Sequence, residues 1–64
     1  PGFSSDLVET LITNPIEKAI AGTIGIKHIR SQSIPGLSVV TVIFEESTDI
    51  FKNRQSISEK LSNL

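Results

Sequence analysis

The chain has 64 residues, a formal net charge of −1, 38% hydrophobic residues and no cysteine. This length allows one domain at most, and a chain so short buries only about 60% of the surface that it exposes when unfolded. The absence of cysteine excludes disulfides and cysteine-ligated metal centres. The near-neutral, scattered charge argues against a surface for nucleic acid or anionic membranes, and the apolar content is too high for a disordered segment.

The sequence shows neither a signal peptide nor a membrane-spanning helix. Its longest nearly apolar run, from Leu37 to Phe44, is far shorter than the roughly 18–20 residues that a spanning helix needs. The first residue is Pro1 rather than a methionine. We therefore expect the chain to be part of a longer protein whose targeting signals lie elsewhere.

The first predicted element is a helix over about residues 5–21. Its apolar side chains recur at helical spacing, as Leu7, Val8, Leu11, Ile12, Ile16, Ala19 and Ile20. Ser4 is a suitable N-cap, and Gly22 follows the last turn as a C-terminal cap glycine. Pro15 interrupts the pattern, because it has no N–H to donate to the carbonyl of Leu11. Two separate helices or one kinked helix would fit, and we favour one kinked helix because the apolar stripe continues on both sides.

Two strands are predicted next, over about residues 26–34 and 38–45. The Pro35-Gly36 turn joins them into an antiparallel hairpin. The three-residue spacing of Ile26 and Ile29 breaks the alternation of a strand, which predicts a bulge at the two residues between them. The second strand is apolar on both faces. We therefore expect both faces to be covered and the strand to lie away from an open edge.

The last predicted element is a helix over about residues 49–64, capped by Thr48 or Asp49. Its sequence predicts an apolar face that packs and an opposite polar face. The apolar face comprises Ile50, Phe51, Ile57, Leu61 and Leu64. The polar face comprises Lys52, Gln55, Ser56, Glu59 and Asn63. Arg54 projects near the apolar face, where its head either reaches water or pairs with a carboxylate such as Glu45.

The order helix, strand, strand, helix predicts an α+β fold in which two helices cover an antiparallel hairpin. One further strand before Pro1 and one after Leu64 would complete β-α-β-β-α-β, the ferredoxin-like arrangement. We therefore interpret residues 1–64 as a single partial domain. An unpaired sheet edge or exposed helix faces would let the isolated chain self-associate.

Side chains capable of chemistry do not form a recognisable site in the sequence. His28 is the only histidine, and it has no cysteine, aspartate or second histidine nearby to complete a ligand set. Glu45, Glu46 and Asp49 gather at a strand end without the spacing of a calcium loop, so a solvated turn is a simpler interpretation than a weak cation-attracting patch. The serines and glycines match neither a G-x-S-x-G elbow nor a phosphate loop. We predict no catalytic, cofactor or metal site, and no enzyme.

Short motifs extend over the whole chain in unbroken order. They are Pro1-Gly2, Pro15-Ile16-Glu17, Gly22 to Lys27, Ile29-Arg30-Ser31, Gly36 to Val42, Phe44, Thr48-Asp49-Ile50 and Arg54-Gln55. Together they resemble the periplasmic region of resistance-nodulation-division (RND) efflux transporters. The second half resembles the heavy-metal branch, of the cobalt-zinc-cadmium resistance type. The chain departs from that branch at Glu46-Ser47 and Lys52-Asn53, which leaves the subfamily and the exported substrate open.

The resemblance implies that the chain is the first pore subdomain in the periplasmic part of a bacterial inner-membrane, proton-driven pump for heavy-metal cations. It also implies a homotrimer that works with a periplasmic adaptor and an outer-membrane channel. The last helix would be the pore helix, and its polar face (Lys52, Gln55, Ser56, Glu59 and Asn63) is then the candidate surface for contacts with other subunits or with the pore. A pump for amphiphilic drugs and a stand-alone ferredoxin-like binding module are the alternatives.

Overall fold

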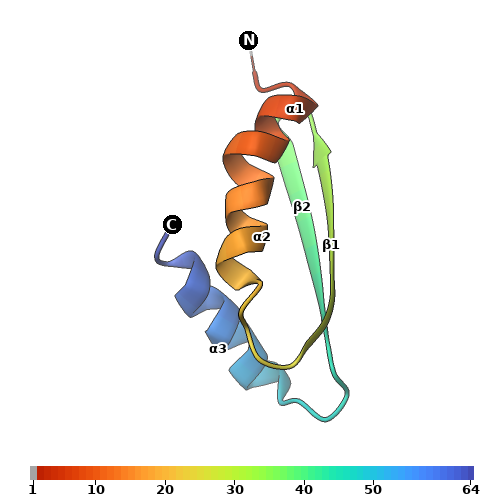
Figure 1. Ribbon diagram of the computed structural model, residues 1–64, viewed down its shortest axis with the longest axis vertical. Helices are drawn as coiled ribbons and strands as arrows, with labels where there is room; N and C mark the ends of the chain where they lie inside the picture. Colours follow the sequence, from red (N-terminus) through yellow and green to blue (C-terminus); the bar gives the residue numbers. More distant parts are fainter. Residues whose placement is uncertain (1) are drawn as a thin grey trace.

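The computed structural model describes residues 2–64 of the chain. It contains a helical segment, two strands and a final helix, which confirms the predicted α+β order (Figure 1). The elements are α1 (Ser5–Val8), η1 (Glu9–Thr13), α2 (Asn14–Ile20), β1 (Ile26–Ile34), β2 (Leu37–Phe44) and α3 (Ile50–Leu61). The turn predicted at Pro1-Gly2 rests partly on Pro1, which lies outside the described residues.

The segments α1, η1 and α2 form one continuous helical column rather than two separate helices (Figure 1). Ser4 is the N-cap, and its hydroxyl accepts a hydrogen bond of 3.3 Å from the N–H of Leu7. In η1 the helix is of the wider π type, and the N–H of Asn14 bonds to the carbonyl of Glu9, five residues back. This turn ends two residues before Pro15, whose ring would crowd the carbonyl four residues back in a regular α-helix. The interruption predicted at the proline is thus accommodated by a π turn.

The π turn decides which side chains of the column are buried. Val8 and Thr13 are 0% and 1% exposed, and the wider turn places both on the face toward the hairpin. In a regular α-helix the residue on that face one turn before Thr13 would be Glu9, whose carboxylate is costly to bury. Leu7 and Leu11 are instead 46% and 56% exposed. The predicted stripe is therefore wrong for these two leucines, because it assumed α-helical spacing throughout.

The strands β1 and β2 pair as an antiparallel, two-stranded hairpin across Pro35-Gly36. Their register is regular from this turn as far as His28, which lies opposite Ile43, and it shifts between His28 and Ile26. This irregularity is the bulge that the spacing of Ile26 and Ile29 predicted. Because of the bulge, both isoleucines are half-buried on the same face of the hairpin.

The outer face of the hairpin, which points away from the helical column, is exposed. On β2 it presents Leu37, Val39 and Ile43, which are 51%, 43% and 38% exposed. Each strand has a single neighbour in the two-stranded sheet. Within residues 2–64, the expectation that β2 is covered on both faces and lies away from an edge is therefore wrong.

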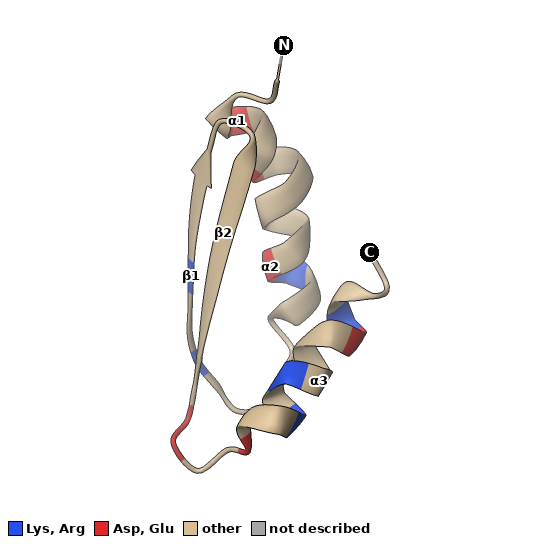
Figure 2. Cartoon of the chain, turned by 180° about the vertical axis from the view of Figure 1, so that it is seen from behind, with Lys and Arg blue, Asp and Glu red and all other residues tan. Residues whose placement is uncertain are grey.

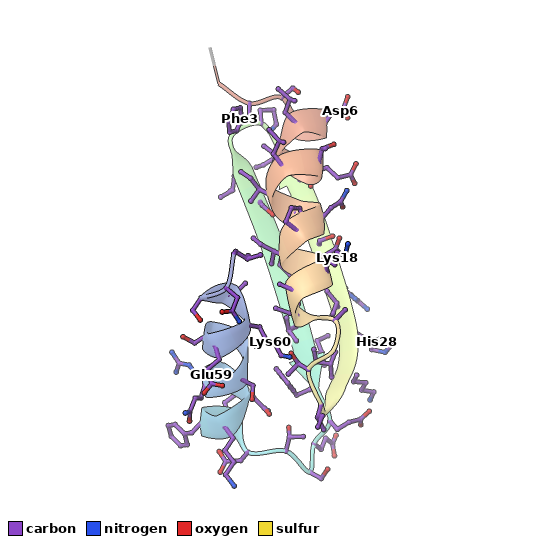
Figure 3. The ribbon with its side chains drawn as sticks, turned by 60° about the vertical axis from the view of Figure 1, so that its left-hand side comes forward. Phe3, Asp6, Lys18, His28, Glu59 and Lys60 are labelled. Carbon is purple, nitrogen blue, oxygen red and sulfur yellow. The ribbon has the colours of Figure 1, made fainter. Side chains whose placement is uncertain are left out.

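The helices contribute unequally to the cover over the hairpin. The segments α1 and η1 lie against both strands, whereas α2 packs mainly against α3 (Figures 1 and 3). Among residues 2–64, the fully buried apolar side chains are Val8 and Ile20. So small an apolar core stabilises the fold only modestly, and polar contacts between the elements become correspondingly important.

A cluster of three hydroxyls joins the π turn to the end of the hairpin. Thr13 Oγ1 lies 2.8 Å from Ser33 Oγ and 2.6 Å from Ser38 Oγ. The two serines are cross-strand partners close to the Pro35-Gly36 turn. Because Thr13 is 1% exposed, water cannot replace either serine as its partner. This hydroxyl cluster (Thr13, Ser33 and Ser38) therefore fixes the column against the hairpin at the turn end.

The start of the chain is attached to the same end of the hairpin. The N–H of Gly36 donates a hydrogen bond of 2.9 Å to the carbonyl of Phe3. Gly2 to Ser4 and Pro35-Gly36 line an open hollow beside this bond. The N-terminal segment thus closes over the hairpin turn.

We expect Thr13→Val to lower the free energy of unfolding by about 1–3 kcal/mol, because Ser33 and Ser38 lose a buried partner while the side-chain shape is kept. Urea unfolding followed by circular dichroism measures this change. The control is Thr10→Val, at an exposed threonine of the same π turn, which should shift the free energy by less than about 0.5 kcal/mol. Equal shifts in the two variants would contradict the role assigned to the hydroxyl cluster.

Candidate functional site

The surface predicted from the sequence lies on α3, and most of it faces solvent. Lys52, Gln55, Glu59 and Asn63 are exposed, with Asn63 just past the end of the helix. Gln55 Nε2 donates a hydrogen bond of 3.2 Å to Glu59 Oε1, and Glu59 projects from the side of α3 that faces away from the column (Figure 3). Ser56, in contrast, is half-buried. We call the four exposed residues the polar face of α3, and Ser56 is not part of it.

The side of α3 that packs is built from small and polar side chains. Asn53 is 8% exposed, and Ser56 and Ile57 are half-buried. The spacing of three and four residues places them on one side of the helix. The predicted apolar packing face is therefore correct at Ile57 but missed Asn53, because a pattern search scores asparagine as a solvent-facing residue.

A third side of α3 carries apolar side chains that remain exposed. Ile50 is 61% exposed, Phe51 is 77% exposed and Leu61 is 37% exposed. The prediction that these three pack within the chain is wrong, and it is also wrong for Leu64, which is 64% exposed. Arg54 lies on the same side and is also exposed, which favours the alternative in which its head reaches water. Such a group of apolar side chains is a candidate interface, and we call Ile50, Phe51 and Leu61 the apolar face of α3.

The helix α3 begins at a side-chain cap. Asp49 Oδ1 accepts hydrogen bonds from the N–H groups of Phe51 and Lys52 at 2.8 and 3.3 Å. This confirms the predicted cap and engages the carboxylate that the sequence places beside Glu45 and Glu46. In the part of the chain that the structure describes, no three His, Cys, Asp or Glu side chains are placed to hold a metal ion.

Charged side chains are spread over the surface rather than gathered in one place. Acidic residues lie on the helices as well as around the loop from β2 to α3, and basic residues lie on α2, α3 and β1 (Figure 2). His28 is an exposed residue of β1, opposite Ile43, and projects away from the column (Figure 3). None of the helices formed by residues 2–64 has the length and apolar character needed to cross a bilayer.

A polar cluster that no sequence pattern predicted lies where α3 begins. Asn53 Nδ2 donates to Thr48 Oγ1 at 2.7 Å, and that hydroxyl donates to the carbonyl of Glu45 at 2.6 Å. The N–H of Glu45 in turn donates to the carbonyl of Gly25 at 2.8 Å. These bonds join the loop before β1, the loop after β2 and the first turns of α3. We call Gly25, Glu45, Thr48 and Asn53 the loop clamp.

Gly25 is the residue of the loop clamp that tolerates no side chain. Its φ is +88°, and a Cβ built on it would lie 2.8 Å from Thr48 Cγ2. Gly22, which we expected to cap the first helix, has no positive φ and has open space around its Cα. The two glycines look alike in the sequence, and the backbone conformation of Gly25 and its packing against Thr48 distinguish them.

Comparison with known proteins decides the family. The family model that describes the AcrB/AcrD/AcrF family matches residues 1–64 of this sequence. The chain belongs to this family. Together with the relatives described next, the match confirms the predicted resemblance to RND efflux transporters of the heavy-metal branch.

Three curated relatives of the chain are named as metal resistance proteins. The chain is 48% identical over 62 residues to the nickel and cobalt resistance protein CnrA of Cupriavidus metallidurans, and 47% identical over 62 residues to the nickel-cobalt-cadmium resistance protein NccA of Alcaligenes xylosoxydans xylosoxydans. It is 43% identical over 61 residues to the cobalt-zinc-cadmium resistance protein CzcA of C. metallidurans. These matches cover 97%, 97% and 95% of the chain but only 6% of each relative. No solved structure matches the chain.

We expect Gly25→Ala to lower the free energy of unfolding by more than about 1 kcal/mol, because the new methyl group strains the backbone and collides with Thr48. Thermal unfolding followed by circular dichroism measures the effect. Gly22→Ala, where nothing lies within 4 Å of the new Cβ, is the matched control and should be neutral or slightly stabilising. The assignment of Gly25 to the loop clamp fails if both substitutions have the same effect.

The isolated chain is expected to self-associate, and the apolar face of α3 is the strongest candidate contact. Phe51→Ser should weaken association by about tenfold or more, since burying a phenylalanine contributes about 1.5–3 kcal/mol. Size-exclusion chromatography with light scattering at two concentrations measures the change. Leu11→Ser, which removes an exposed apolar side chain from the first helical column, is the control and should leave association unchanged. A chain that stays monomeric at millimolar concentration contradicts the prediction, and an unaffected Phe51 variant points to the β2 edge instead.

Proposed function

We propose that the chain is a periplasmic subdomain of a proton-driven inner-membrane pump that exports heavy-metal cations. The observation that carries this proposal is the identity of 48%, 47% and 43% to proteins named for nickel, cobalt, zinc or cadmium resistance, over nearly the whole chain. Because the chain spans 6% of each of these relatives, it supplies one element of such a pump. Its role is structural, in assembly and transmission of movement, and not enzymatic.

The exposed apolar surfaces fit a subdomain that other parts of the parent protein cover. The outer face of the hairpin and the apolar face of α3 both leave large apolar side chains exposed to water. We propose that residues 1–64 form the core of a ferredoxin-like subdomain, in which a strand from the parent protein pairs along β2. Such pairing would satisfy the backbone groups of the edge and bring neighbouring chain over the exposed residues.

We propose α3 as the pore helix, which meets its symmetry mates around the central axis of a homotrimer. The apolar face, Ile50, Phe51 and Leu61, provides surface for the contact between subunits. The polar face lies next to it and remains available to the water of the pore. Ser56 faces the rest of the fold and takes no part in this surface. The periplasmic adaptor and the outer-membrane channel are proposed partners of the whole pump.

The substrate class is tested with the full-length protein, expressed in bacteria that lack their own metal exporters. We expect tolerance to at least one of nickel, cobalt, zinc and cadmium to rise several-fold over cells with an empty vector. Tolerance to an amphiphilic dye should remain unchanged, and an uncoupler that dissipates the proton gradient should abolish the export of metal. Protection against the dye without protection against any metal would instead identify a drug pump.

A further inference from the structure

We propose that the loop clamp is the pivot that sets the direction of α3 relative to the hairpin. The geometry of this pivot follows from the residues of the chain alone. Its importance for transport rests on the proposed function, in which α3 is the pore helix. The loop clamp is therefore the place where a movement of α3 is transmitted to the hairpin or restrained by it.

The hydrogen bonds of the loop clamp have a fixed direction. The Thr48 hydroxyl has one proton, which it donates to the carbonyl of Glu45 at 2.6 Å, so it serves as acceptor toward Asn53 Nδ2 at 2.7 Å. The N–H of Thr48 also donates to the carbonyl of Glu45, at 3.1 Å. The loop after β2 is thus closed on itself by two bonds. Two side chains attach α3 to this loop: Asp49, which caps the first turn, and Asn53, which reaches back from the helix to Thr48.

Packing leaves the loop clamp little freedom to slide. Asn53 is 8% exposed, so water is a poor replacement for its partner Thr48. On the other side, Thr48 Cγ2 lies so close to Gly25 that even a methyl group would not fit between them. The amide of Asn53 thus binds the Thr48 hydroxyl, and the Thr48 methyl group packs against Gly25. Rotation of α3 therefore requires the bond between Asn53 and Thr48 to break or turn.

The rest of α3 is held much less firmly. Its main further contact is with α2, through the side that bears Asn53, Ser56 and Ile57. The last turn is exposed, and Leu64 beyond it is 64% exposed. A helix of 12 residues is about 18 Å long, so a rotation of about 10° at its start displaces its far end by about 3 Å. Displacements of this size repack subunit interfaces.

The identity of residue 53 supports a positioning role. Burial alone would favour alanine or leucine at this helix position, since asparagine is a poorer helix former and its amide must be desolvated. The bond to Thr48 offsets this cost and adds a directional constraint that an apolar side chain does not provide. Asn53 is therefore a positioning residue, and it acts through Thr48 on the loop after β2.

Distance measurements between spin labels test the pivot in the full-length pump. Labels are attached at Gln32→Cys on β1 and Ser58→Cys on α3, both exposed positions, after any native cysteines are replaced and labelled subunits are diluted with unlabelled ones. We expect a narrow distance distribution in the parent and one that is shifted or broadened by several ångströms in Asn53→Ala. Asn63→Ala, at an exposed asparagine after the same helix, is the control and should leave the distribution narrow.

A second pair of variants distinguishes the loss of the hydrogen bond from a folding defect in Asn53→Ala. Thr48→Ser keeps the hydroxyl and should keep the narrow distribution, whereas Thr48→Val keeps the shape without the hydroxyl and should broaden it. An unchanged distribution in Asn53→Ala or Thr48→Val overturns the pivot, whatever the pump exports. Metal tolerance measured in parallel tests the proposed function separately. If the parent protein confers no metal tolerance while Asn53→Ala still broadens the distribution, the metal pump is refuted and the pivot remains.

Discussion

Among residues 2–64, Val8 and Ile20 are the apolar side chains fully removed from water, and this shortage of buried apolar surface shapes the rest of the fold. Directional polar contacts therefore hold the elements together at both ends of the hairpin. The hydroxyl cluster of Thr13, Ser33 and Ser38 fixes the column at the turn end. The loop clamp fixes α3 at the opposite end. Each contact is worth little on its own in water, but both involve a nearly buried side chain that would lack a partner if the elements separated.

The features that could be predicted from the sequence are those set by local patterns. The spacing of Ile26 and Ile29 indicated the bulge, Pro35-Gly36 indicated the turn, and Asp49 was one of two predicted caps. The buried faces of the helices were predicted less accurately, because they depend on contacts between elements. A π turn before Pro15 altered the inward face of the first helix.

The candidate surface on α3 was predictable only in part, for a related reason. Hydrophobic periodicity assumes that apolar side chains pack within the chain, whereas here Asn53 packs and Phe51 is exposed. An exposed aromatic residue is unfavourable for an isolated fold but suits one element of a larger assembly. Similarity to relatives of which the chain spans 6% agrees with this interpretation. Of the five residues predicted for the polar face, four are exposed and Ser56 is half-buried, because Ser56 lies on the side of α3 that packs.

The π turn in the first helix also has an evolutionary consequence. A π turn contains one residue more than the α-helical turn that it replaces, so it is equivalent to a single-residue insertion. A homologue that lost this residue would form a regular helix in which Val8 and Thr13 still share an inward face. An ungapped alignment of the two sequences would then pair inward residues with outward ones on one side of the π turn. Comparisons of this helix between distant homologues should therefore allow a one-residue gap between Glu9 and Thr13.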